Sequence, residues 1–297
     1  MTSNTFYALA FACFLTLSFL SHTGWAHRNM RKESPYEFMK LLKGCKQGDN
    51  VEGIQQLKKF LHHFGYLNQK HLNNRDIDDD YFDESLESAL KTYQLNFNLK
   101  PTGVLDTETV SLLMIPRCGV PDIVDGKTRM KSAGSYNIKY AHFPGSPRWP
   151  VTKKVLNWGL QHGSRRDVIE PLAKYSFQPW VGIAPFTFNF VDGNLSIADI
   201  KIGFLDKSQG MAGNTLGFTY PPTNGTVFFN ADMNWSFGAT PGAYDLGTVG
   251  LHEFGHALGL AHSSVEAAVM WPYTGMAQTK HLHDDDIKGM KALYAAS

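Results

Sequence analysis

The chain has 297 residues, of which 43% are hydrophobic and 19% are charged, and its formal net charge is +1. A chain of this length and composition can bury ordinary cores and predicts two domains in addition to any signal segment. The near-neutral charge gives no indication of a nucleic-acid or membrane-surface partner, so we expect neither.

The first 26 residues predict a secretory signal peptide. An apolar run from Phe6 to Leu20 is followed by small residues at Gly24 and Ala26, as at signal-peptidase sites, although no Lys or Arg precedes the run. The run is shorter than the roughly 20 residues that a bilayer core needs, which disfavours a membrane anchor. The C-terminal "GMKALYAAS" lacks the hydrophobic tail of a lipid-anchor signal. We therefore expect a soluble, secreted protein that begins at His27.

Two cysteines, Cys45 and Cys118, remain once Cys13 leaves with the signal peptide. An extracellular domain without disulfides must be stabilised by core packing, by metals, or by both. Cys118 lies within "PRCGVPD", residues 116–122, and no partner cysteine is obvious. The sequence therefore raises the question of what this thiol binds.

The sequence of the first domain, residues 27–115, predicts a small bundle of three helices. Apolar residues recur near helical period in 50–67 and again in 82–99, after a cap at Asp83 or Ser85. A third helix is expected within 103–114, where the residues Asp106 and Thr109 satisfy half of a capping box. The Asp-rich segment 73–84 lacks the spacing and the turn glycine of a calcium loop, so a solvated loop is favoured over a cation site.

The sequence of the second domain predicts a mixture of α and β structure. Segment 122–154 is polar, basic and rich in Gly, Pro and Ser, which is typical of an exposed linker. Strand texture follows in five segments: 154–160, 186–191, 198–204, 215–220 and 226–235. Helical patterns occupy 164–180, 243–260 and 284–295, the last with three aspartates at its start, where the helix dipole favours them.

The segment "HEFGHALGLAH" places His252, Glu253, His256, Gly259 and His262 in a metal-binding spacing. By chance this pattern would occur in roughly 5 in 100,000 chains of this composition. The first two histidines are one helical turn apart on one face, so they can bind one ion. The third would lie on the opposite face if the helix continued, but glycine tolerates the left-handed conformation that ends a helix. Three neutral histidines leave one tetrahedral position open, as in catalytic zinc sites.

The residues around this motif indicate hydrolysis. Glu253 lies next to the first ligand and is expected to point into the same cleft. The ion would bring the pKa of its bound water to about 7, and Glu253 would accept the proton as general base while the hydroxide attacks a polarised carbonyl. Met270, within "SSVEAAVMWPY", fits the methionine turn beneath such a site.

With these motifs the chain resembles the matrix metalloproteinases of the metzincin class, and is similar to their minimal plant type without a haemopexin-like domain. The resemblance implies an α+β fold: a helical prodomain similar to a peptidoglycan-binding domain, then a catalytic domain with a twisted five-stranded mixed sheet and three helices. The expected bounds are 1–26 for the signal peptide, 27–115 for the prodomain, 116–122 for the cysteine-switch motif, 123–140 for a linker with the activation cleavage, and 141–297 for the catalytic domain.

The resemblance also implies a function. The chain would be a secreted, monomeric zymogen, located in the extracellular matrix or cell wall, that hydrolyses internal peptide bonds of extracellular proteins. Substrate would lie antiparallel to the edge strand "NTLGFTY", with a side chain in the pocket behind the zinc. The thiolate of Cys118 would occupy the open zinc position, favoured by the metal and the neighbouring arginine, until an activating protease cuts within the basic linker that follows Asp122. Arg117 and Asp122 would form an ion pair, whereas Cys45 is expected to be a buried or free thiol.

The sequence departs from this family before the metal-binding helix. Relatives carry a second, structural zinc and calcium there, but segment 203–235 contains no histidine. Phe218 and Phe228 stand where the resemblance leads us to expect histidines, and Asn230 and Met233 stand where acidic calcium ligands would be expected. Asp199 and Asp232 remain as oxygen ligands or as ordinary capping and turn residues. We expect one catalytic zinc, no structural zinc, and calcium binding that is weakened or lost.

A competing hypothesis is a wall-associated scaffold protein, in which the helical domain binds carbohydrate and the metalloproteinase domain is inert. The intact Glu253 and the complete histidine set argue against it. Three sequons, at Asn194, Asn224 and Asn234, suit a secreted glycoprotein.

Overall fold

The computed structural model describes residues 36–67, 77–130, 139–211 and 213–295. The expected signal peptide, residues 1–26, lies outside the described residues. Within the described ranges, no helix is both long and apolar enough to cross a bilayer.

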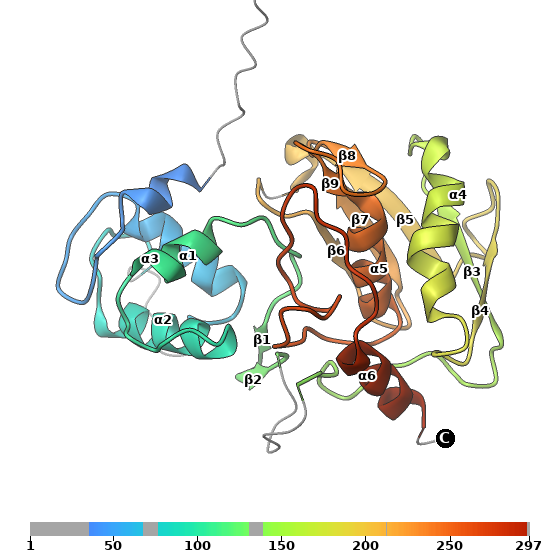
Figure 1. The fold of residues 1–297 in the computed structure, drawn as a ribbon, viewed down its shortest axis with the longest axis horizontal. Helices are drawn as coiled ribbons and strands as arrows, with labels where there is room; N and C mark the ends of the chain where they lie inside the picture. Colours follow the sequence, from blue (N-terminus) through green and yellow to red (C-terminus); the bar gives the residue numbers. More distant parts are fainter. Residues whose placement is uncertain (1–35, 68–76, 131–138, 212, 296–297) are drawn as a thin grey trace, which may run out of the picture. The chain divides into compact units, whose positions relative to one another are not determined.

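In the part of the first domain that the structure describes there are three α-helices, as predicted (Figure 1). They are α1 (Ile54–His63), α2 (Glu84–Asn96) and α3 (Thr107–Leu113), preceded by the 3-10 helix η1 (Glu37–Lys40). The side chain of Asp83 caps α2 by accepting from the N–H of Leu86, which decides between the two candidate caps, and Asp106 caps α3. The core of the bundle consists of fully buried side chains, among them Leu57, Leu61, Leu86, Leu90 and Leu113.

The Asp-rich segment, described from residue 77 onward, is a loop as expected, but its carboxylates have specific partners. Asp80 Oδ1 accepts hydrogen bonds from the backbone N–H of Gly53 at 3.1 Å and of Gln55 at 2.9 Å. Because the N-cap residue of α1 is a glycine, no side chain at that position can cap the helix. Nζ of the buried Lys58 donates to the carboxylates of Asp79 and Asp83. The loop therefore caps α1 from a distance instead of being merely solvated.

Replacing Asp80 with alanine should destabilise the helical domain by about 1 kcal/mol, because two amides at the start of α1 lose their acceptor. Asp80→Asn retains an oxygen acceptor and should recover most of this loss. Asp78→Ala is the matched control, since that side chain is 64% exposed and pairs with Lys59 at the surface. Urea unfolding measures the difference, and equal effects of the two alanine variants would contradict the capping role.

The second domain contains a five-stranded sheet in the order β4-β3-β5-β7-β6. Four strands are parallel: β3 (Val155–Leu160), β4 (Thr187–Phe190), β5 (Ile200–Leu205) and β7 (Thr226–Asn230). The fifth, β6 (Gly217–Thr219), pairs with β7 in the antiparallel sense and forms one edge of the sheet. The predicted mixed sheet, with "NTLGFTY" at its edge, is confirmed. Two short strands, β8 (Trp235–Ser236) and β9 (Tyr244–Asp245), pair separately.

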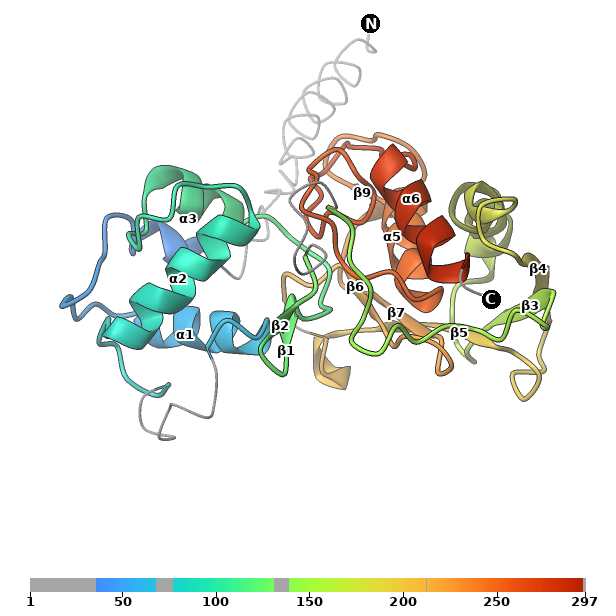
Figure 2. The ribbon, with the colours of Figure 1, turned by 90° about the horizontal axis from the view of Figure 1, so that it is seen from below.

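Three α-helices accompany this sheet: α4 (Ile169–Leu172), α5 (Leu246–Ala257) and α6 (Asp284–Tyr294). Figure 1 shows α4 beside α5, and Figure 2 shows α6 next to α5. The helical pattern predicted over 164–180 is confirmed in part: the segment is helical from Arg166 to Trp180, but α4 is one α-helical turn within a run of 3-10 and π turns. Pro171 and Pro179 lack the backbone N–H that a continuous α-helix requires, which explains the interruption.

Helix α5 is buried along its whole length, and its glycines let neighbouring elements approach closely. Phe254 stacks on Phe177 with the ring centroids 3.8 Å apart. A Cβ atom on Gly250 would meet Ser176 Oγ at 2.5 Å, and one on Gly255 would collide with Met270 Sδ. Met270 therefore packs directly against α5, as the methionine-turn interpretation predicts.

The expectation that 122–154 is an exposed linker is wrong for part of its length. β1 (Ile123–Val124) and β2 (Lys127–Thr128) form a hairpin, and Met130 is fully buried among residues of the helical domain. Trp149 is also buried, and its Nε1 donates to the carbonyl of Ala257 at 2.8 Å. The polar composition of the segment does not indicate that Met130 and Trp149 are buried, because each is a single apolar side chain among polar residues. The activation cleavage expected in 123–140 stays a prediction.

Candidate metal centre

Helix α5 and the turn that follows it bring three histidines together. Asp245 caps the helix by accepting from the N–H groups of Gly247 and Thr248, and His252 and His256 then lie one turn apart. The predicted turn at Gly259 is present, with φ of +107°. A Cβ atom at that position would lie 2.5 Å from a backbone oxygen, so glycine also meets a steric requirement.

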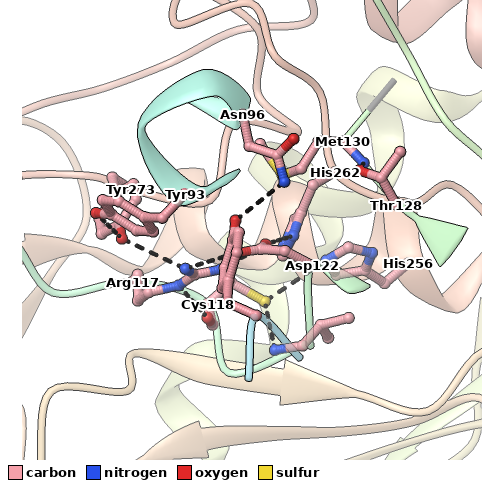
Figure 3. Close-up of polar contacts among 12 residues, drawn as sticks. Tyr93, Asn96, Arg117, Cys118, Asp122, Thr128, Met130, His256, His262 and Tyr273 are labelled. Atoms are coloured by element: carbon pink, nitrogen blue, oxygen red, sulfur yellow. Dashed lines mark hydrogen bonds and ion pairs between the residues drawn. The ribbon is translucent and has the colours of Figure 1, made fainter. Parts of the chain in front are cut away.

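The structure places Cys118 against these histidines. The Sγ atom and the ring nitrogens of His252, His256 and His262 lie within 4.8 Å of one another, and all four residues are buried. The Sγ atom is 3.5 Å from His256 Nε2 (Figure 3). In the part of the chain that the structure describes, this is the one cluster of at least three His, Cys, Asp or Glu side chains suited to hold an ion.

The hydrogen bonds of the imidazoles fix which nitrogen can bind a metal. Nδ1 of His252 lies 2.7 Å from the carbonyl of Val269, and Nδ1 of His256 lies 2.8 Å from the carbonyl of Leu260. Nδ1 of His262 lies 2.8 Å from a carboxylate oxygen. Because oxygens can only accept here, each Nδ1 carries the proton and each Nε2 presents its lone pair.

This donor set fits zinc. Nε2 of His252 and of His262 are buried and have no hydrogen-bond partner among the described residues, as expected of nitrogens directed at an ion. Burial lowers the pKa of both side chains, and that of His256, so the rings are neutral. Three imidazoles and one thiol are the ligand types of tetrahedral zinc.

A buried ionic network holds the Cys118 loop. Arg117 Nη2 donates to Asp122 Oδ1 at 2.7 Å and Nη1 donates to Oδ2 at 2.9 Å, which is the expected pair. The same carboxylate accepts from Tyr66 and from His262 Nδ1. Burial alone would raise the pKa of Asp122, but the Arg117 guanidinium and the imidazole hold it well below its usual range. Asp122 therefore connects the loop directly to a candidate metal ligand, a contact that the sequence analysis missed.

The Cys118 thiol is not ionised by its surroundings alone. Burial and the neighbouring Glu253 raise its pKa well above the ordinary value, although Arg117 acts in the opposite direction. The expected effect of the arginine is therefore correct in direction but outweighed. A bound cation would be needed to favour the thiolate.

Glu253 is fully buried beside the cluster, and burial raises its pKa to about 7. Its Oε2 accepts a hydrogen bond from Thr219 Oγ1 at 2.7 Å. Thr219 is a site residue that was not predicted from the sequence; strand alternation places it on the same face as Gly217. Cys118, His252 and Glu253 line a common pocket.

Asp286 is a further residue that the sequence analysis attributed only to the helix dipole. Its carboxylate accepts from the N–H of Val269 at 2.9 Å and of Met270 at 3.1 Å. Because the carbonyl of Val269 receives His252 Nδ1, Asp286 orients a candidate ligand through the methionine loop.

The fold and the site together define a metalloendopeptidase of the α+β class with a three-histidine motif. The chain matches the Matrixin family model over residues 148–295 and the model of a putative peptidoglycan binding domain over residues 50–113. The chain belongs to the matrixin family, and the resemblance to matrix metalloproteinases is confirmed.

Relatives from plants and animals match most of the chain. Metalloendoproteinase 5-MMP of Arabidopsis thaliana is 34% identical over 284 residues, covering 89% of this chain and 77% of that protein. Metalloendoproteinase 1 of Glycine max is 35% identical over 262 residues, covering 83% of each chain. Matrilysin of Homo sapiens is 33% identical over 224 residues, covering 71% of this chain and 77% of that protein.

Proposed function

We propose that this metalloendopeptidase is made as a latent, secreted, monomeric zymogen that hydrolyses internal peptide bonds of extracellular-matrix or cell-wall proteins. The observation that carries the proposal is the position of Cys118 Sγ, in one buried cluster with three histidine nitrogens. The thiol would occupy the position that an attacking water needs. The exposed asparagines of the three sequons are compatible with a glycoprotein of the extracellular space.

The residues of the site divide the chemistry between them. His252, His256 and His262 would hold one zinc ion, with Cys118 as the fourth ligand in the latent form. A zinc ion bound there would polarise the peptide carbonyl and acidify the attacking water. Glu253 would accept the proton of that water and deliver it to the leaving amine.

The propeptide loop occupies the edge strand that a substrate would use. The N–H of Gly119 donates to the carbonyl of Gly217 at 2.8 Å, and Arg117 forms a parallel bridge with Thr215. An extended peptide can pair with the same edge only after this segment leaves. Latency would therefore have two components, a blocked metal position and a blocked strand edge.

The helical domain strengthens this block through direct contacts with the segment that contains Trp271 and Tyr273. The hydroxyls of Tyr93 and Tyr273 are 2.8 Å apart, and the ring of Phe97 lies edge-on to Trp271 with the centroids 5.2 Å apart. Cleavage within the linker 123–140 by an activating protease would allow the helical domain to leave, which would break these contacts and release the thiol.

The experiment that tests this function treats the purified proenzyme with a thiol-modifying mercurial and follows a quenched fluorescent peptide. We expect cleavage that begins on thiol modification and stops on addition of a zinc chelator. Absence of chelator-sensitive cleavage would favour the scaffold hypothesis. The three histidine nitrogens and the Cys118 sulfur are all buried beside Glu253, and this complete ligand set favours catalysis over the scaffold hypothesis.

The purified catalytic domain should contain close to one tightly bound zinc per chain. The rings of Phe218 and Phe228 pack with their centroids 5.2 Å apart in the segment where a second ion would bind. Asp199 pairs with Lys153 at 2.6 Å, and Asp232 accepts from the N–H of Lys207 at 3.0 Å, so both have structural partners. Metal analysis by mass spectrometry decides the matter, and two tightly bound zincs would refute the prediction. Bound calcium should be weak or absent in the same sample.

A further inference from the structure

The carboxylate of Glu253 is held by a hydroxyl from the edge strand. Thr219 is 5% exposed and Glu253 is 0% exposed, and the 2.7 Å contact joins Oγ1 to Oε2. The other carboxylate oxygen, Oε1, is buried and meets no donor in hydrogen-bond geometry among the described residues, although the Cys118 thiol lies beside this carboxylate. The two oxygens of one side chain are thus in different environments.

Strand β6 creates this difference with two residues on one face. Gly217 and Thr219 are two positions apart, so they point toward the same side of the sheet, while Phe218 points to the other. A Cβ atom on Gly217 would lie 3.2 Å from Glu253 Oε1, closer than most real contacts of that kind. The strand therefore supplies a donor at one oxygen and space at the other.

We propose that Thr219 is a positioning residue for the general base, an inference that rests on the proposed function of Glu253. A hydroxyl that donates to Oε2 fixes the orientation of the carboxylate and leaves Oε1 to receive the proton. Glu253 and Cys118 line the same pocket, where the attacking water would replace the thiol. The bond to Oε2 does not have to break when Oε1 is protonated.

This role differs from simple satisfaction of a buried polar group. A hydroxyl that only stabilises the fold would change the thermal midpoint and leave the turnover of the folded enzyme unchanged. A hydroxyl that orients the base would change kcat, whereas KM and zinc content would be retained. The two roles also differ in which substitutions are tolerated at position 219.

The test compares Thr219→Val, which removes the hydroxyl at constant shape, with Thr219→Ser, which retains it. In the processed holoenzyme, the valine variant should lose about 10-fold in kcat, with KM within about two-fold of the parent. The serine variant should recover most of this loss. Thr187→Val, on the exposed surface of β4, is the matched control. An unchanged kcat in Thr219→Val, or an equal loss in Thr219→Ser, would overturn the inference.

A second measurement does not depend on activity. Thr219→Val should lower the thermal midpoint of the proenzyme in the parent background, and much less in a Glu253→Ala background, where the hydroxyl has no carboxylate to bind. Equal shifts in both backgrounds would show that the hydroxyl and the carboxylate are not coupled, which overturns the inference while the peptidase function stands. A parent enzyme without chelator-sensitive cleavage would overturn the proposed function and this inference together.

Discussion

Unprocessed Cys118→Ser protein should cleave peptides without any activation step. A serine hydroxyl is not ionised near neutral pH and is a poor zinc ligand, so the fourth position would be open to water. If the thiol favours the closed state by about 3 kcal/mol, the open form of the parent is near 1% of the population, and the variant should gain about 100-fold in activity. The measurement is the initial rate on a quenched fluorescent peptide, with gel electrophoresis to show that the chain is intact.

Cys45→Ser is the matched control, because Cys45 is also a buried, unpaired thiol but belongs to the core of the helical domain. That variant should stay latent. Latency preserved in Cys118→Ser would contradict the thiolate block and assign inhibition to the rest of the loop. The network of Arg117 and Asp122, together with the strand edge covered at Gly217, would then be sufficient.

The metal-binding helix and its turn could be predicted because their determinants are local. Two histidines four residues apart share a face of any α-helix, and a glycine is needed where the chain must turn back. Strand segments of the second domain were also recognisable, since β-branched and aromatic residues alternate within short stretches. The segment 164–180 is helical as predicted, but its two prolines, which are also local signals, divide it into short turns of different types.

The contacts that the sequence analysis missed join residues distant in the chain. Asp80 caps α1 although it lies 27 positions after the N-cap residue of that helix, Gly53. Asp122 and His262 are 140 positions apart, and Thr219 and Glu253 are 34 apart. No periodicity within one segment indicates such pairs, because they depend on how folded elements meet. Each is a polar contact at a buried or capping position, where an unpaired partner would be costly.

The aromatic pair of β6 and β7 is a packing feature that the sequence alone does not reveal. The absence of histidine from segment 203–235 predicts that no second zinc binds there, but it does not indicate what holds the two strands together. Phe218 lies directly opposite Phe228 in the antiparallel ladder, where cross-strand aromatic pairs contribute about 0.5–1 kcal/mol. The rings of Phe218 and Phe228 thus stabilise one face of β6, and the opposite face, which covers Glu253, presents Thr219.

Glu253→Gln should abolish most of the turnover while leaving the fold, the zinc and the latency intact. The amide has the shape of the carboxylate and can still accept from Thr219, but it cannot take a proton from water. A general base contributes about 100- to 10,000-fold, so kcat of the processed enzyme should fall by about 1,000-fold with KM nearly unchanged. Glu170→Ala, an exposed glutamate on α4, is the control and should behave like the parent.

Zinc content and the thermal midpoint must be measured on the same Glu253→Gln preparation. A variant that keeps its zinc and its fold but not its turnover has lost a chemical step, because the binding groups on the edge strand and the three histidines are untouched. Turnover equal to that of the parent would mean that the proton is accepted elsewhere. A parent enzyme that itself shows no turnover would be the result that supports the inert-scaffold hypothesis.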